Sequence, residues 1–77
     1  MSCFVCDGIA QVWDRDPDGK SVDCPGCGRY DISASTLADM RQNIRIFIVD
    51  MTRTWLKEQR EAGENPPLIE RHTAFWD

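Results

Sequence analysis

The residues with the clearest chemistry in this sequence are four cysteines, all of which lie within its first 27 residues. They form two pairs, Cys3 with Cys6 and Cys24 with Cys27, and two residues separate the members of each pair. This spacing lets both thiolates of a pair face the inside of one tight turn, or knuckle. Two knuckles placed face to face offer four sulfurs in a tetrahedron, which suits Zn²⁺. The spacing therefore predicts one structural zinc ion held by all four cysteines.

The segment between the two pairs is typical of a β-hairpin. Residues 9–13 alternate in the manner of a strand, the sequence DPDG at 16–19 is a strong turn signal, and residues 21–23 lead back to Cys24. Glycines in and beside the pairs favour the bends that a knuckle needs, because glycine readily takes positive φ angles. Residues 29–33 are expected to add a third strand.

With CFVC, CPGC, a hairpin-length spacer and the GRY that follows, residues 1–33 resemble the zinc ribbon family. The resemblance implies a structural zinc ion but no particular activity, because zinc ribbons serve unrelated roles. CPGCGRYDIS, WLKEQ, Gly63 and PPLI extend the resemblance to a ribbon-plus-helix module of uncharacterised bacterial and phage proteins. That module often precedes larger domains, whose activities do not carry over to this chain.

Two other uses of paired cysteines fit this sequence less well than zinc does. Thiol–disulfide exchange needs one reactive pair at the start of a helix within a βαβ pattern, and neither pair here precedes such a helix. A rubredoxin-like iron site is the second alternative, since CPGCG is similar to a rubredoxin knuckle. The short spacer and the helical second half depart from that family, and a ferric site would absorb visible light whereas zinc would not.

The cellular location of the chain is predicted from the lack of a secretion signal and of a membrane-spanning segment in the sequence. No cationic start followed by an apolar run and a cleavage site is present, and no apolar run approaches the roughly 18 residues of a membrane span. We therefore expect a cytoplasmic protein, in which reduced cysteines bind metal more often than they form disulfides.

From residue 35 onward the apolar residues adopt helical spacing. They recur every three or four positions, at Leu37, Met40, Ile44, Phe47, Ile48, Met51 and Trp55. Ser35 or Thr36 is the expected N-cap, and Gly63 followed by two prolines is expected to end the helix. The pattern predicts one amphipathic helix over 35–63, although a helix that long is unusual in a small domain and a break is the alternative.

These elements predict a small, metal-stabilised α+β fold of one structural domain. It comprises a zinc ribbon over 1–34, the long helix over 35–63 and a C-terminal tail over 64–77. A chain of 77 residues buries too little apolar surface to be comfortably stable by packing alone, so the metal is expected to contribute to folding.

A second apolar patch on the predicted helix is the candidate contact surface. Ile46, Val49 and Leu56 fall on the side opposite the main apolar stripe, and one ribbon cannot cover both sides. Either the tail packs back over this patch, or the helix pairs with a second copy of the chain or another protein. We expect a dimer or a protein partner bound through these three residues. Trp76 either packs back onto the chain or serves as a further anchor for the partner.

Nucleic acid is the alternative partner, and charge argues against it. The chain has 13 acidic and 9 basic residues and a formal net charge of −4, which repels phosphate. Arg53, Lys57 and Arg60 nevertheless lie on one flank of the predicted helix and keep a nucleic-acid-binding regulator in transcription or defence as the alternative.

Catalysis is not expected from these residues. Four cysteines close the coordination shell of a zinc ion, whereas a catalytic zinc keeps one position open. The sole histidine, His72, lies in a polar stretch and is expected to face solvent. The sequence therefore predicts a non-catalytic, zinc-binding interaction or regulatory module.

Overall fold

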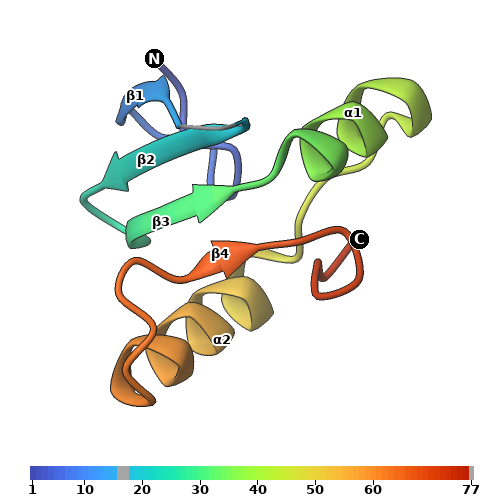
Figure 1. Cartoon of the computed structure of the whole chain (residues 1–77). Coiled ribbons are helices and arrows are strands. Elements are labelled where there is room, and N and C mark those ends of the chain that lie inside the picture. Colours follow the sequence, from blue (N-terminus) through green and yellow to red (C-terminus); the bar gives the residue numbers. More distant parts are fainter. Residues whose placement is uncertain (16–17, 77) are drawn as a thin grey trace.

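A four-stranded sheet organises the chain in this computed structural model, which describes residues 1–15 and 18–76. Its strands, in spatial order, are β1 (Gln11–Asp14), β2 (Lys20–Cys24), β3 (Gly28–Ile32) and β4 (Leu68–Ile69), as Figure 1 shows. The first three strands are antiparallel neighbours, which confirms the predicted hairpin and third strand. Asp16 and Pro17 of the predicted turn lie outside the described residues.

The inner face of the sheet forms much of the hydrophobic core. Val12, Val22 and Tyr30 are cross-strand partners on β1, β2 and β3, and the side chains of Val22 and Tyr30 are fully buried. Residues directly opposite one another on antiparallel strands place their side chains on the same face. The burial of Val22 and Cys24 on β2 and of Tyr30 and Ile32 on β3 therefore follows from one face packing inward.

Two helices replace the single helix predicted over 35–63, so that prediction is wrong. They are α1 (Ala34–Asn43) and α2 (Val49–Glu61). Helix α1 ends at Ile44, which takes a left-handed conformation with φ 50° while its N–H bonds to the carbonyl of Met40. The N-cap of α1 is Ser33, whose hydroxyl accepts a hydrogen bond from the N–H of Thr36, so the predicted caps at Ser35 and Thr36 are also wrong.

The linker between the helices, residues 44–48, is held by the C-terminal tail, which explains the break. Phe47 forms an isolated antiparallel bridge with Trp76, and their rings lie 4.6 Å apart between centroids. The N–H of Ile48 donates to the carbonyl of Phe75 at 2.8 Å. Backbone groups that would continue a helix are thus paired with the tail, and Phe47 is buried as a result.

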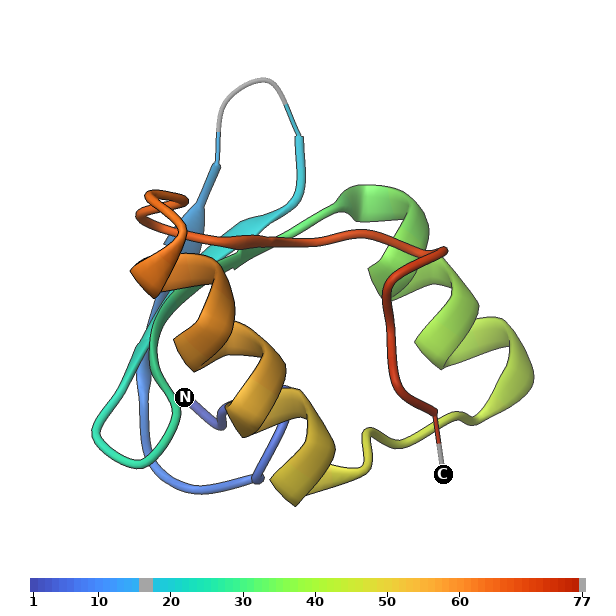
Figure 2. The same ribbon diagram turned by 90° about the horizontal axis from the view of Figure 1, so that it is seen from below.

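The tail packs back over the rest of the molecule. It begins after Gly63, whose φ of 100° confirms the predicted end of the helical segment, and it contributes β4 parallel to β3. Ser33 donates its N–H to the carbonyl of Ile69 at 3.1 Å. Beyond β4 the tail continues toward α1 and turns back to the linker (Figure 2). The tail therefore packs against β3 and the linker rather than extending away from them.

Leu56 is expected to be one of the strongest contributors to stability. Its side chain is 0% exposed on α2, within the core shared with the sheet. We expect Leu56→Ala to lower the free energy of unfolding by about 2–5 kcal/mol, because it removes buried surface and leaves a cavity. Met51→Ala, an apolar change at a 49% exposed position of the same helix, is the matched control and should cost less than about 0.5 kcal/mol.

Chemical denaturation of the metal-loaded chain, monitored by circular dichroism, measures both values. Equal losses in the two variants would contradict the assignment of Leu56 to the core.

Candidate metal centre

The first cysteine pair lies in a short loop that its own backbone closes. Cys3 donates its N–H to the carbonyl of Gly8 at 2.7 Å, and Asp7 donates its N–H to the carbonyl of Cys3 at 3.0 Å. The residue with positive φ in this knuckle is Asp7, at 61°, although the sequence favoured a glycine for such an angle. Aspartate is one of the few residues other than glycine that enters this region readily.

The second pair occupies the turn between β2 and β3. Cys24 is the last residue of β2, and Cys27 immediately precedes β3. Gly28 closes the turn with φ 82°, and it is the register partner of Cys24. The hairpin thus presents both sulfurs of the second knuckle at one end of the sheet, facing the first knuckle.

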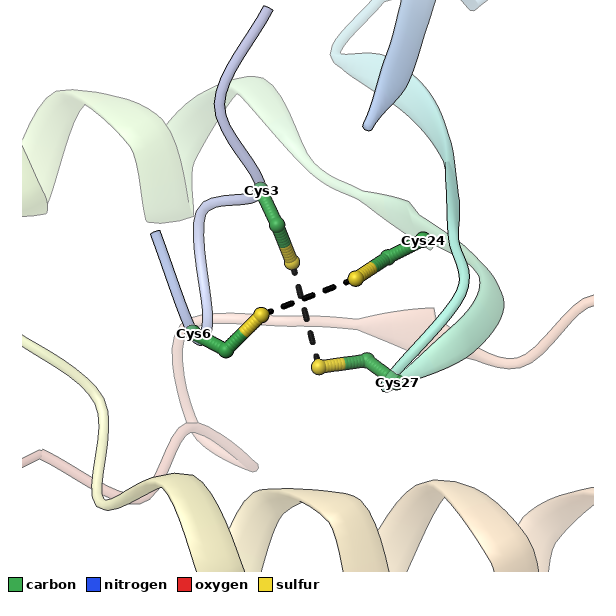
Figure 3. Close-up of side chains that lie close together, drawn as sticks. All are labelled: Cys3, Cys6, Cys24 and Cys27. Atoms are coloured by element: carbon green, nitrogen blue, oxygen red, sulfur yellow. Dashed lines mark hydrogen bonds between the residues drawn. The ribbon is translucent and has the colours of Figure 1, made fainter. Parts of the chain in front are cut away.

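The four sulfur atoms converge on one point. Cys3 Sγ and Cys27 Sγ are 3.8 Å apart, Cys6 Sγ and Cys24 Sγ are 3.6 Å apart, and all four lie within 4.8 Å of one another. Figure 3 shows that the two short lines cross and that each joins one knuckle to the other. A tetrahedral site with metal–sulfur bonds of about 2.3 Å has edges of about 3.8 Å. The four cysteines are therefore positioned to bind one metal ion.

These distances also exclude a disulfide among the cysteines as placed here. A disulfide bond needs sulfurs about 2.05 Å apart, and all four cysteines are free. Cys3, Cys24 and Cys27 are almost completely buried, whereas Cys6 is half-buried. A centre of this kind has one side nearer to solvent than the other.

Burial and backbone hydrogen bonds give the thiols different acidities. Burial raises the pKa of Cys27 to about 12 and also raises the pKa of Cys3, whereas the backbone N–H of Gly8 lowers the pKa of Cys6 to about 6. Metal ions bind the thiolate form. An incoming ion must therefore displace protons from Cys3 and Cys27, so metal affinity should rise with pH.

Two side chains outside the cysteines contact the sulfurs. The hydroxyl of Tyr30 lies 3.1 Å from Cys3 Sγ, and burial raises the pKa of Tyr30 above its usual value, so the hydroxyl is protonated and can donate to a thiolate. Arg53 of α2 donates its Nε–H to Cys27 Sγ at 3.3 Å. Outer contacts of this kind orient metal ligands and adjust their charge.

Arg53 and Arg60, two of the residues predicted for nucleic-acid binding, are turned toward the second knuckle. Arg60 donates from Nη2 to the carbonyls of Cys27 at 2.8 Å and Arg29 at 3.0 Å. Lys57, the third predicted residue, is exposed. The sequence placed Arg53 and Arg60 on one helix flank, but only the fold shows that this flank meets the CPGCG turn.

The residues predicted to bind a partner do not form one surface. Leu56 is fully buried, so its expected place on an outward face is wrong, and Val49 packs partly against the core. Ile46 is 62% exposed, and Trp76 is half-buried against Phe47. The break at the linker changes the helical phase between positions 46 and 56, so residues on one face of a continuous helix are separated here.

His72 is exposed, as the sequence predicted, and its Nδ1 lies 3.8 Å from Glu70 Oε2. No helix among the described residues is both long and apolar enough to cross a bilayer. Comparisons with protein-family models, with curated protein sequences and with solved structures find no match to this chain. The resemblance to zinc ribbons therefore rests on the cysteine pattern and on the geometry of the centre.

Loss of one sulfur is expected to unfold the chain. A structural zinc site contributes about 10–16 kcal/mol of apparent binding energy, which is comparable to the whole stability of a small domain at about 5–15 kcal/mol. We expect Cys24→Ala to lose its stoichiometric metal and its cooperative melting transition, as measured by native mass spectrometry and circular dichroism.

Ser35→Ala, a change at an exposed serine outside the centre, is the control and should keep both properties. A Cys24→Ala chain that retains one metal ion and the melting temperature of the unmodified chain would rule out this role for the cysteines.

Proposed function

We propose that this chain is a non-catalytic module of the zinc ribbon type, in which one Zn²⁺ ion is structural and the surface serves contact with protein. The observation that carries the proposal is the pair of distances between the knuckles, 3.6 and 3.8 Å, which fits the edges of a zinc–thiolate tetrahedron. Zinc is favoured over other divalent ions because four soft thiolates in tetrahedral geometry suit it best.

A structural role for zinc is supported by the closed shell of ligands. All four tetrahedral positions are filled by cysteine sulfurs, three of which are almost completely buried. A catalytic zinc instead keeps a position for water or substrate. The proposal includes a cytoplasmic location, because a reducing compartment keeps the thiols available for metal.

The proposed contact surface is the groove between the first knuckle and the linker, which we call the knuckle groove. It has a volume of about 620 Å³, and its apolar lining includes Phe4, Val5, Met40, Ile46, Phe47 and Val49. An exposed apolar patch of this kind commonly marks a contact site. Two of the residues predicted for partner binding, Ile46 and Val49, line the groove, which supports this choice.

A second copy of the chain is the proposed occupant of the knuckle groove. A two-fold symmetric interface uses the same patch on both subunits, so it needs a projecting part and a receiving part within one patch. On the linker, Ile46 lines the groove and is 62% exposed, and Ile44, two residues earlier in the chain, is 89% exposed. The linker of one subunit can therefore supply apolar side chains to the groove of the other.

The identity and number of the metal are measured directly. We expect native mass spectrometry of the chain purified under reducing conditions to show one zinc ion per chain, and a strong chelator to remove it together with the folded circular dichroism spectrum. A coloured preparation with an iron absorption band would contradict zinc and favour the rubredoxin-like alternative. A chain that stays fully folded after metal removal would contradict a structural role.

Self-association is tested by Ile46→Glu. We expect the unmodified chain to show concentration-dependent dimerisation in sedimentation velocity, and Ile46→Glu to weaken it at least about tenfold, since burial of an unpaired carboxylate costs more than the roughly 1.4 kcal/mol that corresponds to a factor of ten.

Ile9→Glu is the matched control, because Ile9 is 89% exposed and does not line the knuckle groove. It should leave dimerisation unchanged. A chain that is monomeric at every concentration would contradict self-association.

A further inference from the structure

Helix α2 contacts a single metal ligand through two arginines. Arg53 donates to the sulfur of Cys27 at 3.3 Å, and Arg60 donates to the carbonyl of the same residue at 2.8 Å. The two arginines are about two helical turns apart and therefore lie on the same face of α2. Both the side chain and the backbone of Cys27 are thus held by one helix from the second half of the chain.

The second knuckle is shaped to receive these side chains. A Cβ atom at Gly26 would lie 2.6 Å from Arg53 Nη2, and one at Gly28 would lie 2.5 Å from Arg60 Nη2. Both distances are far below ordinary van der Waals contact, so a larger residue at either position would displace a guanidinium group. The CPGCG turn therefore accommodates the arginines as well as the bend of the backbone.

The charge of a metal-loaded centre explains why a guanidinium belongs there. Four thiolates and one divalent ion carry a formal charge of −2, and three of the four sulfurs are almost completely buried. A buried net charge is costly unless opposite charge and hydrogen-bond donors offset it. Arginine is positively charged at every accessible pH, and its hydrogen bonds to anionic acceptors are among the stronger ones in proteins.

The contacts around the sulfurs single out Arg53 for this role. Within residues 1–15 and 18–76, the side chains outside the cysteines that hydrogen-bond to a sulfur are Tyr30 and Arg53. Tyr30 supplies a neutral donor to Cys3, whereas Arg53 supplies a positive charge to Cys27. Cys3 and Cys27 form one edge of the tetrahedron, at 3.8 Å, so both ends of this edge carry an outer contact.

We propose that Arg53 is a positioning residue of the metal centre, which offsets the charge of the sulfur shell at Cys27 and thereby couples zinc retention to the docking of α2. This inference rests on the proposed zinc site and adds a residue from a different part of the chain to it. The coupling is reciprocal, because a helix that strengthens metal binding is itself stabilised by the metal to the same extent.

The affinity experiment compares three full-length chains. Competition with a chromophoric chelator measures the zinc affinity of the unmodified chain, of Arg53→Gln and of Lys57→Gln. Arg53→Gln keeps an N–H donor and removes the charge, and we expect it to bind zinc about 10–100-fold more weakly, as is typical when an outer contact of a metal site is lost. Lys57→Gln removes the same charge from an exposed position of the same helix and should leave the affinity unchanged.

A spectroscopic experiment separates contact with the sulfur from general docking of α2. In the Co²⁺-substituted chain, the thiolate-to-metal charge-transfer bands depend on the energy of the sulfur lone pairs. Removal of the guanidinium in Arg53→Gln raises that energy, so these bands should move to lower energy. Arg60→Gln loses contacts to backbone carbonyls and not to a sulfur, so it should lower the melting temperature without moving the bands.

The outcomes distinguish failure of this inference from failure of the proposed function. If the unmodified chain binds no zinc, the proposed function fails and this inference fails with it. If it binds zinc but Arg53→Gln matches Lys57→Gln in affinity and in the cobalt spectrum, only the role of Arg53 is overturned.

Arg53→Lys keeps the proposal testable if Arg53→Gln does not fold. Because lysine retains the positive charge, recovery of folding and of part of the zinc affinity supports charge compensation. A lysine variant as defective as the glutamine variant would overturn it.

Discussion

The convergence of four sulfur atoms is the constraint on which the rest of this molecule depends. The loop of the first knuckle is held by contacts within residues 1–10, among them the bridge between Ser2 and Ile9 and the hydrogen bond that Ala10 donates from its N–H to the carbonyl of Met1. The sulfurs of Cys3 and Cys6 meet those of the β2–β3 turn at 3.8 and 3.6 Å. A metal ion bound at that point would join these two segments, in a chain near the lower limit for stability by packing alone.

The second constraint is the return of the C-terminal tail. β4 extends the sheet beside β3, and Trp76 covers Phe47 at the break between the helices. The core is therefore built from the sheet, α2 and the tail together, with Leu56 and Ile69 fully buried among them. Of the four residues predicted to contact a partner, the fold buries Leu56 and packs Trp76 against Phe47. The other two, Ile46 and Val49, line the knuckle groove. Large apolar side chains that stay exposed include Ile9, Ile44 and Ile46.

The parts of the fold that the sequence predicted are those fixed by local chemistry. The cysteine spacing, the strands around it and the left-handed Gly63 each follow from residues close together in the chain. The helix break does not, because the three-and-four apolar spacing continues through residues 44–48, and the groups that interrupt it are Phe75 and Trp76 from the far end of the chain. Because the sequence prediction assumed one continuous helix, it also placed Leu56 on an outward face instead of in the core. The sequence identified Arg53 as a basic residue on one flank of the helix. Its contact with Cys27 could not be predicted, because α2 and the second knuckle are far apart in the sequence and meet only in the folded chain.

The contacts of the two arginines also affect how strongly this acidic chain could attract nucleic acid. The formal net charge is −4 before the metal centre is counted, and four thiolates with one divalent ion add two further negative charges. Arg53 and Arg60 are directed at this centre and its backbone, which leaves Lys57 as the exposed member of the basic flank. Two of the three basic residues predicted to bind nucleic acid therefore form hydrogen bonds within the chain, which leaves less positive charge to attract phosphate. The proposed contact with protein instead uses the apolar knuckle groove, which these arginines do not line.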